Sequence, residues 1–343
     1  MTGYDADLLV VGGGPAGLAA ALYARRAGLS VVIAEPRGGP IDKACGEGLM
    51  PGGLARLRPL GVDPPGVAFR GIAYVDPAGR RAEAPFRSGP GRGVRRTQLH
   101  AALRTAASGV DWVPVRVEGL SQDAYGVTAA GLRTRWLIGA DGLHSTVRRA
   151  IGVPARPGTP RRYGLRRHWR VAPWADVVEV YWAAHGEAYV TPVAEDLVGV
   201  AILYGRRGCS YTDLLAGFPA LAARLRGAEP DGPVQGAGPL RQVVPTRVCG
   251  RVLLVGDAAG YEDALTGEGV SLALGQAEAA IGALAAGDPS GYEAAWHRVT
   301  RRYRWLTRGL VLGTRQRPAR RLLVAGCRAA PGAFARVVNA LAR

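Results

Sequence analysis

The stretch that decides the fold is Asp7-Leu8-Leu9-Val10-Val11-Gly12-Gly13-Gly14-Pro15-Ala16-Gly17. Its apolar first half predicts a buried strand over residues 7–11, and a helix follows from Ala16 to about residue 27. Gly12 permits a tight turn, Gly14 lets the backbone approach a pyrophosphate, and Gly17 lets the helix pack closely on the strand. The helix N-terminus then offers free N–H groups to the phosphates. The stretch therefore predicts a dinucleotide-binding unit.

A second strand and an acidic residue complete this unit. The strand is predicted over residues 30–34. It ends at Glu35, about twenty residues beyond the glycines, where dinucleotide-binding folds carry the acid that holds a ribose hydroxyl pair. The cofactor contacts predicted from this part of the chain are Gly12, Gly14, Pro15, Ala16, Gly17, Glu35 and Arg37.

Two further segments specify which dinucleotide is bound. Gly139-Ala140-Asp141-Gly142 lies in the middle of the chain, and Gly256-Asp257-Ala258-Ala259 lies near its end. Three such segments in this order indicate non-covalent FAD, because the first cradles the pyrophosphate and the last reaches the ribityl chain and the flavin ring. A second G-x-G-x-x-G is missing, so NAD(P)H is expected to bind only transiently, as a reductant.

The composition of the chain excludes several other classes of protein. The formal net charge is +17, and residues 294–343 supply +12 of it, with twelve arginines and no acid. No nucleic-acid-binding module accompanies this tail, so no nucleic-acid partner is predicted. The four cysteines and five histidines show no spacing typical of a disulfide framework or a metal site. No apolar run is long enough for a transmembrane helix, and a strand begins too early for a signal peptide. The sequence thus predicts a cytoplasmic protein.

The order of the segments predicts an α/β fold, α+β overall, with a discontinuous nucleotide-binding domain. This domain comprises residues 1–65, 92–155 and 248–290. A substrate domain with an antiparallel sheet, formed by residues 66–91 and 156–247, is inserted into it. Alternating apolar residues predict its strands at 177–182, 187–192 and 198–203. A helix is predicted at 270–285, and residues 291–343 form a basic helical tail, broken at Pro318 and Pro331.

These motifs resemble those of a known family. Residues 139–148 resemble the D-G fingerprint, residues 256–259 the G-D fingerprint, and Val94-Arg95-Arg96-Thr97-Gln98-Leu99 the R-x-x-L helix start of FAD-dependent monooxygenases of the p-hydroxybenzoate hydroxylase type. The geranylgeranyl reductases are relatives of that family. The resemblance implies a Rossmann-like, glutathione-reductase-type FAD domain, with Arg96 and Asp257 contacting FAD. The further implied cofactor residues are Val117, Asp141, Gly142, Gly256, Gly267, Glu268 and Gly269.

Two segments resemble the reductase branch more closely than the hydroxylases. They are Thr266-Gly267-Glu268-Gly269 and Cys45-Gly46-Glu47-Gly48. The first is predicted to open a helix whose N–H groups face the flavin, with Thr266 as its N-cap. The W-x-W-x-I-P motif of flavin halogenases is absent, which disfavours that relative.

Three residues of one loop are candidates for catalysis. Lys43 is the only lysine of the chain, and an ammonium near the flavin would stabilise negative charge; a chance surface position is the alternative. Cys45 lies close enough for a cation to favour its thiolate, or it simply fills the pocket wall. Glu47 is either an acid/base group or a hydrogen-bond partner of the glycine-rich loop. The histidines form no constellation, and none is assigned a role.

The predicted activity is an NAD(P)H-driven FAD monooxygenase that hydroxylates or epoxidises an apolar aromatic or olefinic molecule with O₂. The alternative is a flavin-dependent reductase of prenyl double bonds, and a flavin-dependent sensor is a third class. Aromatic residues lie among the arginines of the tail. The tail is therefore either a helix docked on the FAD domain or a contact surface for an anionic membrane or an acidic carrier protein. The sequence sets no oligomeric state.

Overall fold

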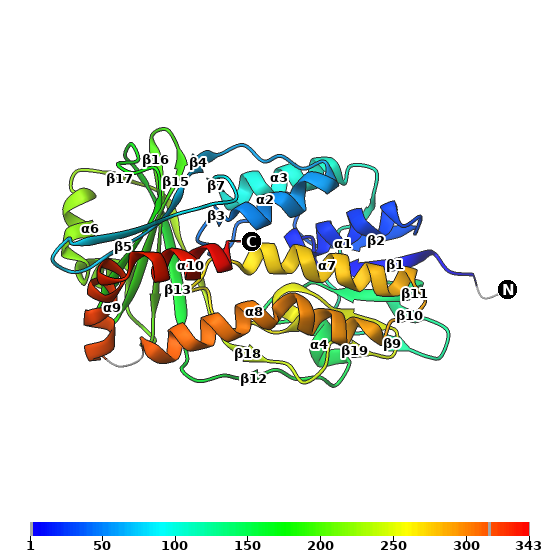
Figure 1. Cartoon of the computed structure of the whole chain (residues 1–343). Helices are drawn as coiled ribbons and strands as arrows, with labels where there is room; N and C mark the ends of the chain where they lie inside the picture. Colours follow the sequence, from blue (N-terminus) through cyan, green and yellow to red (C-terminus); the bar gives the residue numbers. More distant parts are fainter. Residues whose placement is uncertain (1–2, 315–316, 343) are drawn as a thin grey trace.

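A computed structural model describes residues 3–314 and 317–342. Two large sheets lie end to end in it, and helices run along both of them (Figure 1). This arrangement confirms the predicted α/β fold with a parallel Rossmann-like sheet and an additional antiparallel sheet.

The first sheet is built on the strand that the opening stretch predicts. β1 (Ala6–Val11) pairs in parallel with β2 (Val31–Ala34) on one side and with β11 (Leu132–Gly139) on the other. β1 is almost entirely apolar because helices and strands bury both of its faces, as is usual in parallel sheets. The other strands of this sheet are β8 (Asp111–Val113), β9 (Ser121–Gln122), β10 (Val127–Ala129), β19 (Val248–Cys249) and β20 (Val252–Leu254).

Helices α1 (Pro15–Arg26) and α7 (Gly269–Ala285) pack against each other beside this sheet. Both carry small residues at the contact, and Ala20, Ala24, Ala277 and Ala280 are fully buried. The remaining helices of this half are α2 (Pro51–Leu57), η1 (Arg58–Leu60), α3 (Arg96–Ala106), α4 (Thr146–Ala150) and η2 (Gly256–Ala259).

The second sheet has seven strands in the order β17-β13-β16-β15-β14-β5-β6 and is antiparallel except where β14 meets β5. Its strands are β5 (Gly71–Val75), β6 (Arg81–Pro85), β13 (Tyr163–Arg170), β14 (Val178–Ala183), β15 (Gly186–Ala194), β16 (Leu197–Tyr204) and β17 (Glu229–Ala237). Two short helices, α5 (Tyr211–Ala216) and α6 (Pro219–Arg224), follow β16.

Small sheets join the two halves, and here the structure differs from the expected strands. β4 (Val67–Phe69) pairs with β7 (Gly91–Gly93), which also pairs with β3 (Gly48–Leu49), so β4 does not extend the large antiparallel sheet. β12 (Arg156–Pro157) pairs with β18 (Gln242–Val243). In the first sheet, β8 ends at Val113, because its partner β2 ends at Ala34.

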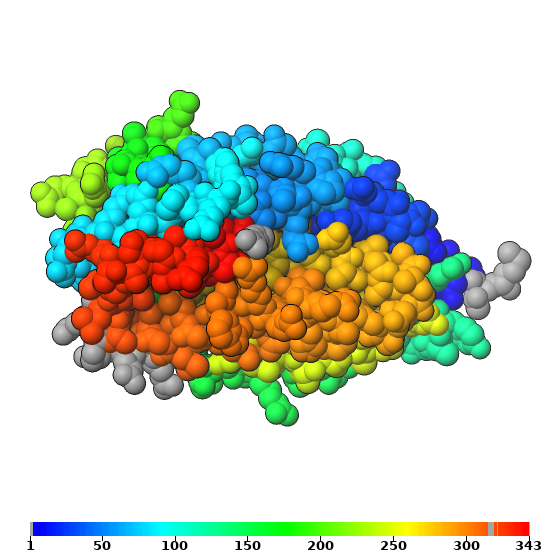
Figure 2. Space-filling view, in the orientation of Figure 1, coloured from blue at the N-terminus to red at the C-terminus, as the bar shows by residue number. Residues whose placement is uncertain are grey.

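Among its described residues, the tail forms helices α8 (Gly291–Gly313), α9 (Arg317–Ala329) and α10 (Pro331–Leu341). α8 packs along α7, whereas α9 and α10 pack on β6 of the antiparallel sheet. These helices form a continuous band, orange to red, across one face of the molecule (Figure 2). Pro318 lies in the first turn of α9 and Pro331 opens α10, so both prolines stand where a helix starts.

Aromatic residues of the tail are largely core residues. Tyr292, Trp296 and Tyr303 are buried on α8, and the Tyr292 hydroxyl donates a hydrogen bond to the carbonyl of Leu254 at 2.8 Å. Phe334 of α10 packs against the ring of Tyr74. Within the part of the chain that the structure describes, no helix is long and apolar enough to cross a membrane.

Candidate cofactor and substrate site

One cavity of about 610 Å³ extends from the carboxyl end of β1 to the antiparallel sheet. One half of it is lined by the glycine-rich segments of the first sheet, and the other half by apolar residues of the second sheet and α10. The lining residues named by the sequence motifs are Gly12, Gly14, Pro15, Ala16, Glu35, Arg37, Arg96, Val117, Asp141, Gly142, Gly256, Asp257, Gly267 and Gly269.

The first glycine turn has the geometry of a phosphate cradle. Gly12 adopts φ +107°, and a Cβ there would lie 2.6 Å from the carbonyl oxygen of Ala140. A Cβ on Gly17 would lie 1.9 Å from the carbonyl oxygen of Gly12, so Gly17 serves the contact between α1 and β1. A Cβ on Gly14 would meet nothing closer than Nη2 of Arg96, at 3.8 Å. Gly14 therefore keeps the cavity open at the N-terminus of α1.

Glu35 is fixed at the end of β2. One of its carboxylate oxygens accepts a hydrogen bond from the backbone N–H of Gly13 at 2.9 Å, and Arg37 Nε donates to the other at 2.7 Å. Burial opposes ionisation, but the hydrogen bonds from Arg37 and Gly13 outweigh it and lower the pKa of the Glu35 carboxyl. An ionised carboxylate at this point suits the hydroxyl groups of a ribose.

The D-G and G-D segments meet at the cavity through Arg148. Its guanidinium donates to the carbonyls of Ala258 and Leu143, each at 2.9 Å. Asp141 Oδ2 caps α4 by accepting from the backbone N–H of Thr146 at 2.7 Å. The middle and late motifs are thus held together, as a shared ligand requires.

Buried polar atoms without a hydrogen-bond partner test whether this half fits FAD. Among the described residues, none forms a hydrogen bond with Nη1 of Arg96 or with Oδ1 of Asp141. Both atoms are buried, and both residues line the cavity. A buried guanidinium without a full set of acceptors is costly unless an anion completes it. A pyrophosphate would supply that anion beside the cradle of Gly12 and Gly14. The residues therefore fit FAD, which would lie against Glu35, Arg96 and Asp257.

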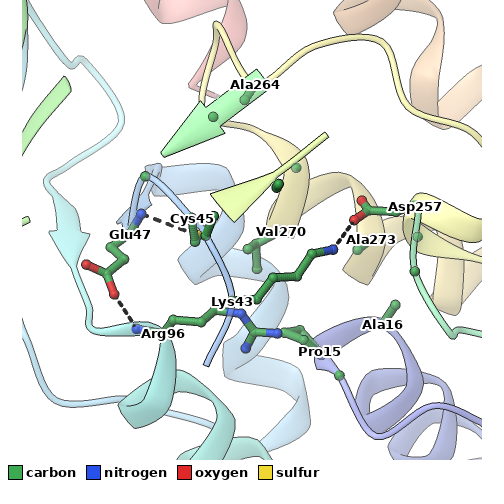
Figure 3. Close-up of a pocket in the computed structure, with 18 of the residues that line it drawn as sticks. Pro15, Ala16, Lys43, Cys45, Glu47, Arg96, Asp257, Ala264, Val270 and Ala273 are labelled. Atoms are coloured by element: carbon green, nitrogen blue, oxygen red, sulfur yellow. Dashed lines mark hydrogen bonds and ion pairs between the residues drawn. The ribbon is translucent and has the colours of Figure 1, made fainter. Parts of the chain in front are cut away.

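Lys43 reaches across the cavity to the G-D segment. Its Nζ lies 2.7 Å from Oδ2 of Asp257, and the close-up shows the extended side chain pointing at that carboxylate (Figure 3). The pair joins residues far apart in the sequence, and both side chains are partly exposed. Lys43 therefore lines the cavity.

Cys45 and Glu47 differ in their surroundings. Both line the cavity, and burial raises the pKa of the Cys45 thiol, which favours the alternative that it fills the pocket wall over that of a thiolate. Glu47 adopts φ +59° and is buried. Its carboxylate accepts from the backbone N–H of Arg96 at 2.8 Å and lies 2.6 Å from Nε2 of His168. The thiol is thus protonated and faces the cavity, whereas the carboxylate is held by neighbouring residues.

The loop before α7 differs from the expectation in two respects. Thr266 is not the N-cap: the cap position is held by Glu268, and the Thr266 hydroxyl instead shares a hydrogen bond with that of Thr307. α8 lies close enough for its Thr307 to bind the Thr266 hydroxyl, and the Thr266 side chain therefore does not cap α7. Glu268 lies outside the cavity lining, and its burial raises the pKa of its carboxyl to about 8. Gly267 and Gly269 do line the cavity at the start of the helix.

The other half of the cavity is apolar. Six strands of the antiparallel sheet and α10 contribute to its wall, and Thr191 of the sheet and Thr266 of the loop before α7 are polar residues of the lining. The apolar lining residues are Met50, Phe69, Ile72, Tyr74, Val178, Val180, Tyr189, Leu203, Leu240, Leu265, Val338 and Leu341. Arg166 of β13 also lines the cavity and is charged, but its guanidinium is already paired with Asp42, and the Tyr189 hydroxyl is already bonded to the carbonyl of Leu265 at 2.7 Å. The arrangement suits an apolar molecule without a charged anchor.

Sequence reasoning missed two groups of residues at this site. Arg166 and His168 alternate on β13 and face inward, and two polar residues at i and i+2 of a strand are the signal that could have found them. Val338 and Leu341 come from α10, and the apolar residues of this helix did not indicate that it lines a cavity.

Comparisons with known proteins agree with this geometry. Residues 7–39 match the model of the FAD-dependent oxidoreductase family. The chain is 28% identical to a menaquinone reductase of Mycolicibacterium smegmatis, over 85% of this chain and 79% of that protein. It is 26% identical to a digeranylgeranylglycerophospholipid reductase of Methanococcus vannielii, over 78% of this chain and 74% of that protein.

Solved structures share the whole fold. A flavin-dependent brominase superposes with a TM-score of 0.83 at 19% identity, covering 98% of this chain and 93% of that one. The p-nitrophenol 4-monooxygenase of Pseudomonas putida superposes with a TM-score of 0.75 at 21% identity, covering 96% and 92%.

The fold and the site thus define a FAD-dependent oxidoreductase. The chain is similar in sequence to a digeranylgeranylglycerophospholipid reductase, and it shares its fold with a flavin-dependent brominase and a p-nitrophenol 4-monooxygenase.

Proposed function

We propose that this enzyme reduces carbon–carbon double bonds in the isoprenoid chain of a neutral lipid or quinone. The observation that carries the proposal is the predominantly apolar half of the cavity, which opens directly into the half that fits FAD. A chain of isoprene units needs such a wall and no ionic anchor, because its transfer from water is driven by apolar surface alone. Two relatives matched over most of their length support it by their names, which are those of a menaquinone reductase and a digeranylgeranylglycerophospholipid reductase.

Bound FAD would supply the two-electron chemistry, with NAD(P)H as the transient source of the electrons. Glu35, Arg96 and Asp257 would hold the cofactor. Saturating a double bond also requires two protons, and the protonated thiol of Cys45 faces the cavity as a candidate donor for one of them. Lys43 would favour the reduced, negatively charged flavin by bringing its ammonium to that side of the cavity. Glu47 would act by holding the loop and not as an acid or base.

A second candidate is the monooxygenation of an apolar olefinic or aromatic molecule. The observation in its favour is that the same predominantly apolar wall would also exclude water around a reactive oxygen species. The two activities differ in their products. Reduction adds two hydrogens to each double bond and proceeds without O₂, whereas monooxygenation adds one oxygen atom from O₂.

Product analysis tests the proposed function. The holoenzyme is incubated with NADPH and a geranylgeranyl lipid, with and without O₂, and the lipid is examined by mass spectrometry. We expect the gain of two hydrogens per double bond in both atmospheres. A product that carries an oxygen atom and forms only in air would establish the monooxygenase instead.

We further propose that the tail contacts an anionic membrane surface from which such a substrate is taken. On α8, Arg298, Arg301, Trp305 and Leu312 lie on one exposed stripe, and Trp305 is 75% exposed. Leu322 of α9 adds a further exposed apolar residue to the same band of helices. Cationic residues with an exposed indole suit the interface of an anionic bilayer. The same tail supplies Val338 and Leu341 to the cavity wall, which links the surface to the substrate site.

A further inference from the structure

The loop of residues 42–48 carries Lys43 and Cys45 into the cavity, yet it has regular structure only at its end, where β3 begins. A loop of this kind needs specific contacts to hold one conformation. Glu47 shows that such contacts exist, because a non-glycine residue at φ +59° stays there only where its surroundings hold it.

Glu47 is held on three sides. Its carboxylate accepts from the backbone N–H of Arg96 at 2.8 Å and meets His168 Nε2 at 2.6 Å, and its carbonyl accepts from the N–H of Val94 at 2.8 Å. The sheet is shaped to receive this carboxylate. Gly199 lies opposite His168 on β16, and a Cβ there would be 2.8 Å from Oε2 of Glu47. Any side chain at residue 199 would displace the carboxylate.

The neighbour of His168 fixes its hydrogen-bonding roles. Arg166 Nη1 lies 3.0 Å from Nδ1 of His168, and a guanidinium can only donate. Nδ1 must therefore accept, so the ring proton is on Nε2 and is donated to Glu47. The strand presents both side chains on one buried face, since they are two residues apart on β13.

Arg166 also reaches the other end of the loop. Its Nη2 donates to the carboxylate of Asp42, and it is 3% exposed. Arg166 and His168 thus hold residue 42 on one side of Lys43 and Cys45, and residue 47 on the other. Thr191 of β15 adds a bond from its hydroxyl to the carbonyl of Gly46 at 2.7 Å.

We propose that Arg166 and His168 are positioning residues, which clamp the loop of residues 42–48 so that Lys43 and Cys45 face the cofactor. The link to catalysis rests on the proposed function, but the clamp itself does not. The sequence provides a readout for it: Lys43 is the only lysine, so a lysine-specific protease can cut the chain only after residue 43, inside this loop.

The test measures the rate of this single cleavage under native conditions. His168→Leu removes the donor and keeps a similar volume, whereas His168→Gln keeps an amide N–H. We expect His168→Leu to be cleaved at least about tenfold faster than the wild type, because a buried hydrogen bond to a carboxylate is lost. His168→Gln should be cleaved nearly as slowly as the wild type.

Two further variants complete the design. Tyr292→Phe also removes a buried hydrogen bond, between α8 and β20, and should leave the cleavage rate unchanged. Gly199→Ala places a methyl group against the Glu47 carboxylate and should accelerate cleavage. If His168→Leu does not fold, the cleavage rate of Gly199→Ala tests the clamp in its place. Cleavage of His168→Leu and Gly199→Ala at the wild-type rate would overturn the clamp. So would equal acceleration in His168→Gln or in Tyr292→Phe.

Discussion

At the residue scale, we expect the ion pair between Lys43 and Asp257 to affect turnover and not the stability of the fold. The pair is partly exposed, and such pairs contribute less than about 1 kcal/mol to stability. We expect Lys43→Met to keep its FAD and its thermal stability, while turnover falls at least about tenfold through loss of a cation at the flavin. Lys43→Arg should recover only part of the rate, since the guanidinium is larger and planar. Stopped-flow and steady-state rates check this, and unchanged kinetics in Lys43→Met would make the residue a bystander.

The buried carboxyl of Glu268 predicts that the stability of the folded protein depends on pH. Burial raises the pKa of its carboxyl to about 8, above that of an unfolded glutamate. The folded state therefore binds the proton more tightly, and the stability from this group is present at low pH and is lost as pH rises from about 4.5 through about 8. Urea unfolding at about pH 5 and about pH 9 measures the loss. Glu268→Gln should lose less stability between these two pH values than the wild type. An equal loss in both proteins would contradict the assignment.

At the element scale, the β1–α1 unit separates two roles of glycine. Gly14 has φ −74° and space for a Cβ, so Gly14→Ala should fold with wild-type stability and bind FAD weakly, because the methyl group enters the cradle. Gly17→Ala drives a Cβ to 1.9 Å from the Gly12 carbonyl, so it should lose about 1–3 kcal/mol even without FAD. Urea unfolding of the apoproteins and FAD fluorescence titration distinguish the two. Similar apoprotein stabilities would show that Gly17 serves the cofactor and not the helix contact.

The same scale shows what the sequence can predict. The β1–α1–β2 unit and the ends at Gly139 and Gly256 were predicted because local spacing encodes them. The partnership of Glu47 with His168 joins residues 121 positions apart, and no local pattern encodes such a pair. The docking of α10 on β6 was missed for the same reason, because a helix sequence states which face is apolar but not what covers it. The roles assigned to Lys43 and Cys45 stay predictions.

At the scale of the whole molecule, the arginine-rich band predicts salt-dependent binding to anionic vesicles. Each arginine near an anionic leaflet contributes about 1 kcal/mol, so Arg298→Gln with Arg301→Gln should weaken binding by more than about tenfold. Trp305→Ala should weaken binding as well. We expect no binding to neutral vesicles, and none to anionic vesicles at high salt. Arg206→Gln with Arg207→Gln, on the exposed loop after β16, is the matched control and should bind as the wild type does. Co-sedimentation measures all of these. No binding at low salt would leave the band as a solvated surface or a site for an acidic protein.

The central claim is that an isoprenoid chain in the apolar half of the cavity meets the flavin in the other half. The most direct measurement is a single turnover in the absence of O₂. The purified yellow enzyme is reduced, freed of excess reductant and mixed with a geranylgeranyl lipid, while the absorption of oxidised flavin is followed. We predict that this absorption returns and that one double bond is saturated for each flavin oxidised. Flavin that stays reduced until O₂ is admitted would contradict the reductase and assign the cavity to monooxygenation.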